Sequence, residues 1–264
     1  MSLAGNYISE GMALALQTVL SDFMFEDKLI PPPVQIHEVN LDDNGLTDKS
    51  FAMILSALDK HHPNIGKFNY SNNEIGMESI NIMNKIMSRP GDKKLHELRL
   101  SSLRADAEIQ YEVLRMVREA TSIKKLRLSN FKCTNKRMIK KLKRICENEQ
   151  LVELNLSNNN LLAKDLAKLM KFIESNDGLK SLNLSHNALI STEAEKAEID
   201  DKEAFAAQVE GRNAKFKSNS NEFIGLLIGF IKKSDVLNHL DVSNMNLGAR
   251  LQQLVWPVYH SRSL

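Results

Sequence analysis

Cationic side chains are concentrated between Ile123 and Glu147, and they carry the most evident binding chemistry of this chain. Lysine and arginine attract carboxylates and phosphates, and arginine can hold either group with two parallel hydrogen bonds. Ten of them fall in this stretch, opposed by the single acid Glu147. They are Lys124, Lys125, Arg127, Lys132, Lys136, Arg137, Lys140, Lys141, Lys143 and Arg144.

The last six of these residues form a predicted basic patch on an outer helix surface: Lys136, Arg137, Lys140, Lys141, Lys143 and Arg144. The apolar residues between them have the spacing of one inward helix stripe, which turns the charges outward. The patch is either the solvated face of a lysine-rich helix or a site for an acidic partner. Such a partner would be an acidic protein tail, a phosphorylated segment or, least favoured, nucleic acid, because no aromatic residues are interleaved for stacking on bases.

Motifs for enzymatic chemistry are absent from the sequence. It contains no G-x-x-x-x-G-K-S/T, no G-x-G-x-x-G, no H-E-x-x-H and no paired C-x-x-C. His239 lies two residues before Asp241, but no serine or cysteine nucleophile is placed beside them. We therefore expect a protein that is not an enzyme, with no cofactor, no metal and no small-molecule substrate.

The residues that must position these side chains recur in a fixed frame, clearest in the stretch LVELNLSNNNL of residues 151–161. With Leu151 as position one, apolar residues occupy positions one, four, six and eleven, and asparagine occupies position nine. Successive starts from Ile36 to Leu179 are 29, 30, 28, 28 and 28 residues apart, which is the periodicity of a solenoid. The frame starts at Ile36, Ile65, Leu95, Ile123, Leu151, Leu179 and Leu237.

The frame resembles that of the leucine-rich repeat superfamily, and its length is similar to that of the ribonuclease-inhibitor-like subclass. The resemblance covers nearly the whole chain and implies an α/β solenoid, or horseshoe, with a concave parallel β-sheet and convex α-helices. Because members of this superfamily bind many unrelated partners, it implies little about the particular function.

The same architecture follows from the residues themselves. The alternation of Leu154 and Leu156 predicts a short strand with one buried face, and Glu153 and Asn155 then point outward. The asparagine at position nine can satisfy backbone groups that the following turn leaves unpaired. The second half of each unit has helical spacing. Since strands pack about 4.8 Å apart and helices about 8–10 Å apart, the stack is expected to curve with the sheet inside.

Outward strand positions three and five provide the predicted partner-binding surface. Adjacent parallel strands place equivalent residues about 4.8 Å apart, so Arg99 and Arg127 are expected to be neighbours that receive a carboxylate or phosphate. In the alternative interpretation, Glu97 and Glu153 partly neutralise them. The candidate residues on this face are Lys67, Asn69, Glu97, Arg99, Lys125, Arg127, Glu153 and Asn155.

We expect residues 1–264 to form a single leucine-rich repeat domain, with a partial repeat at 1–35 and complete repeats from 36 to the last at 237–264. The interval from Leu179 to Leu237 exceeds one unit by 30 residues. We place an insertion at about 190–220 and the helix of the sixth unit at Glu222 to Ser234. In the competing interpretation, the stretch from Lys215 is a degenerate repeat.

A scaffold that binds a protein partner through its concave sheet and adjoining loops is the leading functional hypothesis, as a segment or subunit of a cytoskeletal, ciliary or sensor assembly. The alternative is a small-GTPase regulator, because some GTPase-activating proteins are similar in repeat class. The net charge of +2 is too small to indicate nucleic acid or membrane. Cys133 and Cys146 take core positions, which favours reduced thiols and a cytoplasmic protein with no membrane insertion.

Overall fold

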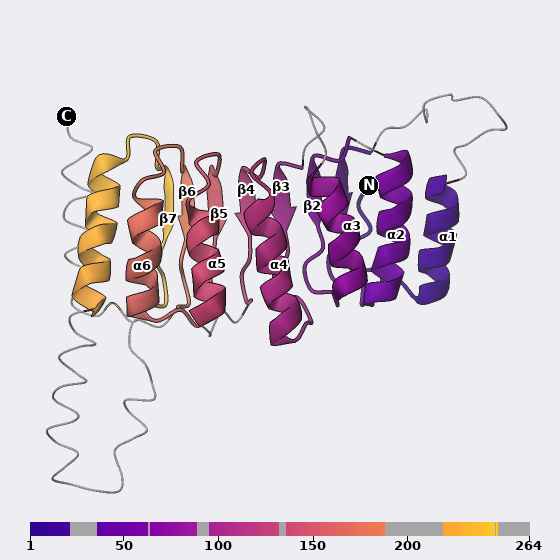
Figure 1. The fold of residues 1–264 in the computed structure, drawn as a ribbon, viewed down its shortest axis with the longest axis horizontal. Coiled ribbons are helices and arrows are strands. Elements are labelled where there is room, and N and C mark those ends of the chain that lie inside the picture. Colours follow the sequence, from indigo (N-terminus) through magenta and orange to yellow (C-terminus); the bar gives the residue numbers. More distant parts are fainter. Residues whose placement is uncertain are drawn as a thin grey trace, which may run out of the picture. The chain divides into compact units, whose positions relative to one another are not determined.

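The computed structural model of this chain describes residues 1–21, 36–62, 64–88, 95–131, 136–187, 219–245 and 247. Contacts divide the chain into two compact units, residues 1–131 and residues 132–264. Each unit is described by itself. Both are built from parallel strands that alternate with helices (Figure 1), so the predicted α/β repeat architecture is confirmed. The subclass of leucine-rich repeat stays a prediction.

In the first unit, four parallel strands lie side by side in chain order, and each strand pairs with the next at equivalent frame positions. Residues 1–3 extend this sheet, because Ser2 forms a parallel bridge with Asn40. The strands are β1 (Glu38–Asn40), β2 (Lys67–Asn69), β3 (Glu97–Arg99) and β4 (Lys125–Arg127). The helices are α1 (Glu10–Ser21), α2 (Asp48–His61), α3 (Met77–Met87) and α4 (Ala107–Glu119).

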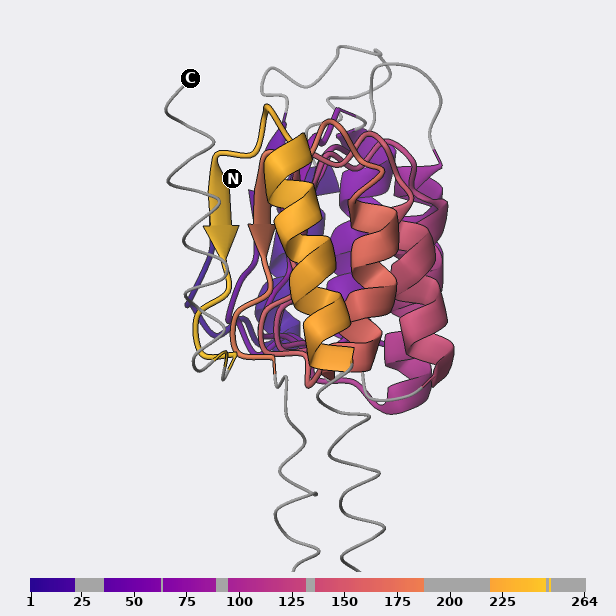
Figure 2. The ribbon, with the colours of Figure 1, turned by 90° about the vertical axis from the view of Figure 1, so that its left-hand side faces the viewer.

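The second unit repeats this arrangement with three parallel strands, each followed or preceded by a helix. Figure 2 shows its helices on one side of the strands, and no described helix covers the other face of the sheet. The elements are α5 (Lys136–Cys146), β5 (Glu153–Asn155), α6 (Ala163–Ile173), β6 (Ser181–Asn183), a helix at residues 219–233 and β7 (His239–Asp241).

The strands form where the frame places alternating apolar residues. The central residue of each strand from β1 to β6 is buried under the helices, whereas its two neighbours face the open side of the sheet in all of these strands except β3, where Glu97 is also buried. The buried set is Val39, Phe68, Leu98, Leu126, Leu154 and Leu182. Their burial against the helices supplies the main favourable contribution to folding.

Buried asparagines at position nine join consecutive repeats, as the sequence predicts. In the first unit, Asn73 Oδ1 accepts hydrogen bonds from the backbone N–H groups of Asn44 and Leu46, both at 3.1 Å. Its Nδ2 donates to the carbonyl oxygens of Leu41 at 2.7 Å and Ser71 at 2.9 Å. Asn187 makes the equivalent bonds in the second unit. The turns that precede Asn73 and Asn187 by one repeat are therefore held by the side chain of the next repeat.

The turns have a second repeated feature, which is a left-handed residue at position eight. Asp43, Asn72 and Ser102 have φ angles of 52°, 61° and 53°, and the same conformation recurs later in the chain at Asn130, Asn158, His186 and Asn244. Asparagine and aspartate tolerate this conformation better than most residues, because their short side chains can hydrogen-bond locally. The sequence frame did not identify this position.

Strands β6 and β7 pair directly although their partners Ser181 and His239 are 58 residues apart. In the described part of the chain no strand lies between β6 and β7. The choice between an insertion and a degenerate repeat stays a prediction. The helix predicted from Glu222 to Ser234 is found at residues 219–233. The proposed insertion itself, Cys133 and the residues around the three consecutive prolines lie outside the described residues.

Candidate protein-interaction surface

The open side of each sheet is formed by strand positions three and five, which we call the sheet face. In the first unit, position three alternates in charge along Glu38, Lys67, Glu97 and Lys125. Position five changes from asparagine in β1 and β2 to arginine in β3 and β4. The asparagines and the arginines therefore divide this face into two regions with different chemistry.

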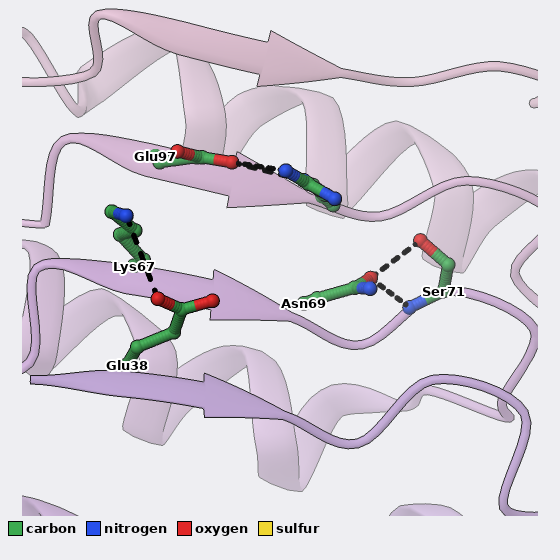
Figure 3. Close-up of polar contacts among 6 residues, drawn as sticks. Glu38, Lys67, Asn69, Ser71 and Glu97 are labelled. Carbon is green, nitrogen blue, oxygen red and sulfur yellow. Dashed lines mark hydrogen bonds and ion pairs between the residues drawn. The ribbon is translucent and has the colours of Figure 1, made fainter. Parts of the chain in front are cut away.

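The position-five asparagines are engaged in the turns that follow their strands. Asn69 Oδ1 accepts hydrogen bonds from the backbone N–H of Ser71 at 3.1 Å and from its hydroxyl at 2.9 Å (Figure 3). In the second unit, Asn155 Oδ1 accepts from the N–H of Ser157 at 2.9 Å. These side-chain oxygens close the turn after the strand. Asn69 and Asn155 were predicted to bind a partner; in the structure their side chains close the turns that follow their strands.

Strands β3 and β4 close the same turn without position five. The backbone N–H of Ser101 donates to the hydroxyl oxygen of Ser71 at 3.1 Å, and the N–H of Ser129 donates to that of Ser101 at 3.2 Å. A serine of the preceding repeat therefore replaces the asparagine of the same repeat. Because the backbone donor is satisfied in this way, position five can carry Arg99 and Arg127.

Arg99 and Arg127 occupy paired positions on neighbouring strands, as predicted from the frame. The guanidinium of Arg99 donates to Glu97 Oε1 from Nε at 3.0 Å and from Nη2 at 2.6 Å. Glu97 is nearly buried, with 11% of its side chain exposed, whereas 37% of the Arg99 side chain is exposed. Arg127 is exposed. Glu97 thus holds Arg99 in place and neutralises part of its charge, as the alternative interpretation expected.

The charges around Glu97 keep it ionised. Burial of the carboxyl raises its pKa, but the hydrogen bond from Arg99 and the positive charges of Arg99, Lys125 and Lys67 outweigh burial and hold the pKa below its ordinary value. At neutral pH the four central side chains at β3 and β4, which are Glu97, Arg99, Lys125 and Arg127, therefore carry a net positive charge. We call these four residues the arginine region.

At the other end of this face, Lys67 forms a weak ion pair with Glu38, with 3.5 Å between Nζ and Oε2 (Figure 3). Both side chains are about half exposed, so solvent screens the pair and its contribution to stability is small. A shallow hollow between β1 and β3 is lined by these residues together with Asn40, Asn69 and Arg99. Its volume of about 30 Å³ admits water and no metabolite.

The sheet face of the second unit has fewer cations. Glu153, Ser181 and His239 occupy position three, and Asn183 Nδ2 donates to Asp241 Oδ2 at 2.9 Å at position five. Burial of the Asp241 carboxyl raises its pKa. Hydrogen bonds from Ser243 and Ser185 and the charge of His239 outweigh burial and hold the pKa below its ordinary value. The positive region predicted on the open sheet face therefore belongs to the first unit.

The basic patch predicted on α5 lies on the outer side of that helix. Its inward stripe is buried as expected: Met138, Ile139, Leu142, Ile145 and Cys146. Of the six cations, Lys136, Arg137, Lys140 and Arg144 are exposed, whereas Lys141 and Lys143 are partly buried. Arg144 pairs with Glu147 at 3.0 Å, and the Lys143 ammonium lies 4.6 Å from the centre of the Phe172 ring.

Metal-ligand clusters are not found in the described part of the chain. There, no group of three or more His, Cys, Asp and Glu side chains is placed as metal ligands would be. Cys146 is fully buried, and burial raises the pKa of its thiol to about 12, so it is not a nucleophile in the folded state. Among the described helices, none is long and apolar enough to cross a membrane.

The sequence analysis did not identify the serines that close the turns after β3 and β4 in place of position five, although their recurrence at one frame position could have revealed them. Serine occupies position seven in every frame from Ile65 onward, at Ser71, Ser101, Ser129, Ser157, Ser185 and Ser243. A polar residue recurring beside the outward positions indicates a turn function. It also missed His62, which is buried at the end of α2, because a single histidine carries no periodic signal.

The chain matches no protein-family model and no curated protein.

Proposed function

We propose that this protein is a non-enzymatic scaffold that binds an acidic segment of a protein partner on the arginine region of the first unit. The observation that carries the proposal is the change of residue type at position five. Five of the seven strands carry asparagine or aspartate that closes a turn there, and the two adjacent strands β3 and β4 carry arginine.

The energetic argument concerns the cost of this exchange. An outward arginine gains nothing from the turn, and Arg99 and Arg127 place two like charges on neighbouring strands, which lie about 4.8 Å apart. An anionic partner removes this repulsion. Arginine also matches carboxylate geometry with two parallel hydrogen bonds, and Glu97 restricts the motion of Arg99, so less conformational entropy is lost when an acid binds.

The partner is inferred to be a protein because of the shape of this face. The strands present a row of short and long polar side chains along the sheet, and the hollow beside them is too small for a metabolite. A repeat array of this kind presents an extended binding surface instead of a single deep pocket. A role in a larger assembly, such as a cytoskeletal, ciliary or sensor complex, remains part of this proposal.

The proposal is tested with Arg99→Glu combined with Arg127→Glu. We expect the proteins captured by the wild-type chain to include partners that this variant loses, and the affinity of an isolated partner to fall at least about tenfold. The matched control is Lys60→Glu with Lys85→Glu, which makes the same charge change at exposed positions on α2 and α3 of the same unit. Circular dichroism checks that both variants are folded.

Equal affinity of the arginine variant and the wild-type chain for every isolated partner would reject this site. Equal weakening by the control variant would also reject it, because the effect would then come from net charge alone. Only a loss confined to the arginine variant supports binding at β3 and β4.

A further inference from the structure

The outer surfaces of α5 and α6 carry a high density of positive charge among the described residues of the second unit. The two helices contain nine lysines and arginines and a single acid, Asp165. They pack against each other in the second unit, and the apolar residues of both are buried beneath them. We call the cationic side chains of these two helices the basic helix face; none of them belongs to the sheet face of the proposed function.

The cations form two rows. On α5, Lys136, Lys140 and Arg144 follow each other at intervals of four residues, and on α6, Lys164, Lys168 and Lys171 do the same at intervals of four and three. Such intervals place side chains on one side of a helix, about 5–6 Å apart. Packed helices lie about 8–10 Å apart, so two parallel rows of positive charge run along the pair.

Part of this charge has a local partner and part has none. Arg144 pairs with Glu147, Lys168 with Asp165 at 3.4 Å and Lys171 with Glu222 at 2.7 Å. In contrast, Lys136, Lys140 and Lys164 are exposed and form no ion pair with any residue that the structure describes. The positive charge without an ion pair among the described residues therefore lies toward the N-terminal ends of both helices, at Lys136 and Lys140 on α5 and at Lys164 on α6.

The residue types on the basic helix face indicate which kind of polyanion, nucleic acid, lipid surface or acidic protein segment, fits it best. Phe172 is the only aromatic residue on the two helices, and the Lys143 ammonium lies over its ring, so no ring is available to stack on a base. None of the exposed large apolar residues of the described chain lies on α5 or α6, so there is no side chain to insert among lipid tails. A polyanion that is read by charge alone remains.

We propose that the basic helix face binds an extended acidic protein segment that runs between the lysine rows of α5 and α6. In an extended chain, alternate side chains point to opposite sides and repeat about every 6.6–7 Å. Consecutive glutamates or aspartates therefore point alternately toward Lys136 and Lys140 on one side and toward Lys164 on the other. The flexible lysine side chains accommodate the difference between this repeat and the spacing along the helices.

The test uses the whole chain and a fluorescein-labelled oligoglutamate peptide, with binding followed by fluorescence anisotropy. We expect the triple variant Lys136→Glu, Lys140→Glu, Lys164→Glu to bind the peptide at least about tenfold more weakly, because three attractions become repulsions. Binding to the wild-type chain is expected to weaken as salt is raised. Acids at positions 136 and 164, in the first turns of α5 and α6, are favoured by the helix dipole, and position 140 is exposed, so the variant is expected to fold.

Two further variants make the result specific. Lys60→Glu, Lys85→Glu, Lys124→Glu changes the net charge equally in the first unit and is expected to bind the peptide as the wild type does. Arg99→Glu with Arg127→Glu removes the site of the proposed function, so it abolishes any peptide binding at the arginine region and is expected to keep the peptide binding that depends on Lys136, Lys140 and Lys164. Peptide binding that is lost only in this arginine variant would overturn the present inference and leave the proposed function intact.

Other outcomes also overturn it. Equal binding by the α5–α6 variant and the wild type places the peptide elsewhere. Retention of the wild-type chain by phosphatidylserine vesicles or by a DNA duplex, without peptide binding, assigns the face to a membrane or to nucleic acid. Only peptide binding that depends on the three lysines, and is stronger than vesicle or duplex binding at the same salt, supports an acidic protein segment.

Discussion

The turns after β2 and β3 have the same backbone requirement and meet it with different side chains. After β2, Asn69 of the same repeat accepts the hydrogen bond from the N–H of Ser71. After β3, the hydroxyl of Ser71 in the preceding repeat accepts it from Ser101. The comparison shows that a repeat array can move a structural role from one repeat to its neighbour, so that the outward position is no longer needed to close the turn.

The exchange is possible only at position five, at the edge of the turn. Position nine lies inside it and is either asparagine with several backbone bonds, as in Asn73, or a buried apolar residue, as in Phe131. An interior position must satisfy the backbone completely or replace the polar group with apolar packing. An edge position has water as an additional partner.

The largest expected effect is the difference in lost stability between a substitution at position nine and one at position five. Asn73→Ala removes five hydrogen bonds to buried backbone groups, and we expect it to lower the free energy of unfolding by about 4 kcal/mol. Asn69→Ala affects one partly exposed turn and is expected to cost about 1 kcal/mol. Chemical denaturation of both variants measures the difference. Equal losses would show that burial of the turn does not decide the cost.

A medium effect tests the transfer of the turn bond from asparagine to serine. Ser71→Ala leaves the N–H of Ser101 without its acceptor, and we expect a loss of about 1.5 kcal/mol. In a chain that also carries Arg99→Asn, the new asparagine can close the turn, so the same serine change is expected to cost about 0.5 kcal/mol. A double-mutant cycle from denaturant unfolding gives the coupling of about 1 kcal/mol. Strict additivity would contradict the proposed exchange.

The smallest effect concerns Glu97. Its pKa in the folded protein lies below the ordinary 4.5, so the stability that it provides is present above pH 4.5 and is lost as the pH falls through the lowered value. Glu97→Gln removes this dependence. We expect the difference between wild type and variant to shrink by at most about 1 kcal/mol on acidification, because Arg99 is partly exposed and solvent screens the pair. Unfolding curves at several pH values measure it, and a difference that grows in acid would contradict the pair.

Much of the fold could be predicted because burial imposes a period. The alternation around Leu154 and Leu156 identifies the strand, and equal frame positions of Arg99 and Arg127 predict that they are neighbours, which the strand register confirms. The inward stripe of α5 follows from the same reasoning. Such residues are determined by one dominant effect, the removal of apolar surface from water.

The site could be predicted only in part, because outward side chains are not constrained by a period. Asn69 and Arg99 hold the same frame position, yet one closes a turn and the other contacts Glu97 in its own strand. These directions depend on which donor lies nearby in three dimensions. Glu97 is buried, although the frame places it on the solvent side.

Chemical labelling of the buried Cys146 thiol can measure how often α5 opens in the folded protein. Thiol reagents attack the thiolate, and burial both covers the sulfur and raises its pKa to about 12. Labelling therefore requires a fluctuation that exposes α5, and its rate measures the free energy of that opening under native conditions. In a chain with Cys133→Ser, such labelling follows α5 alone. If an acidic segment binds along α5 and α6, it slows the labelling of Cys146, because the open form must first release its ligand.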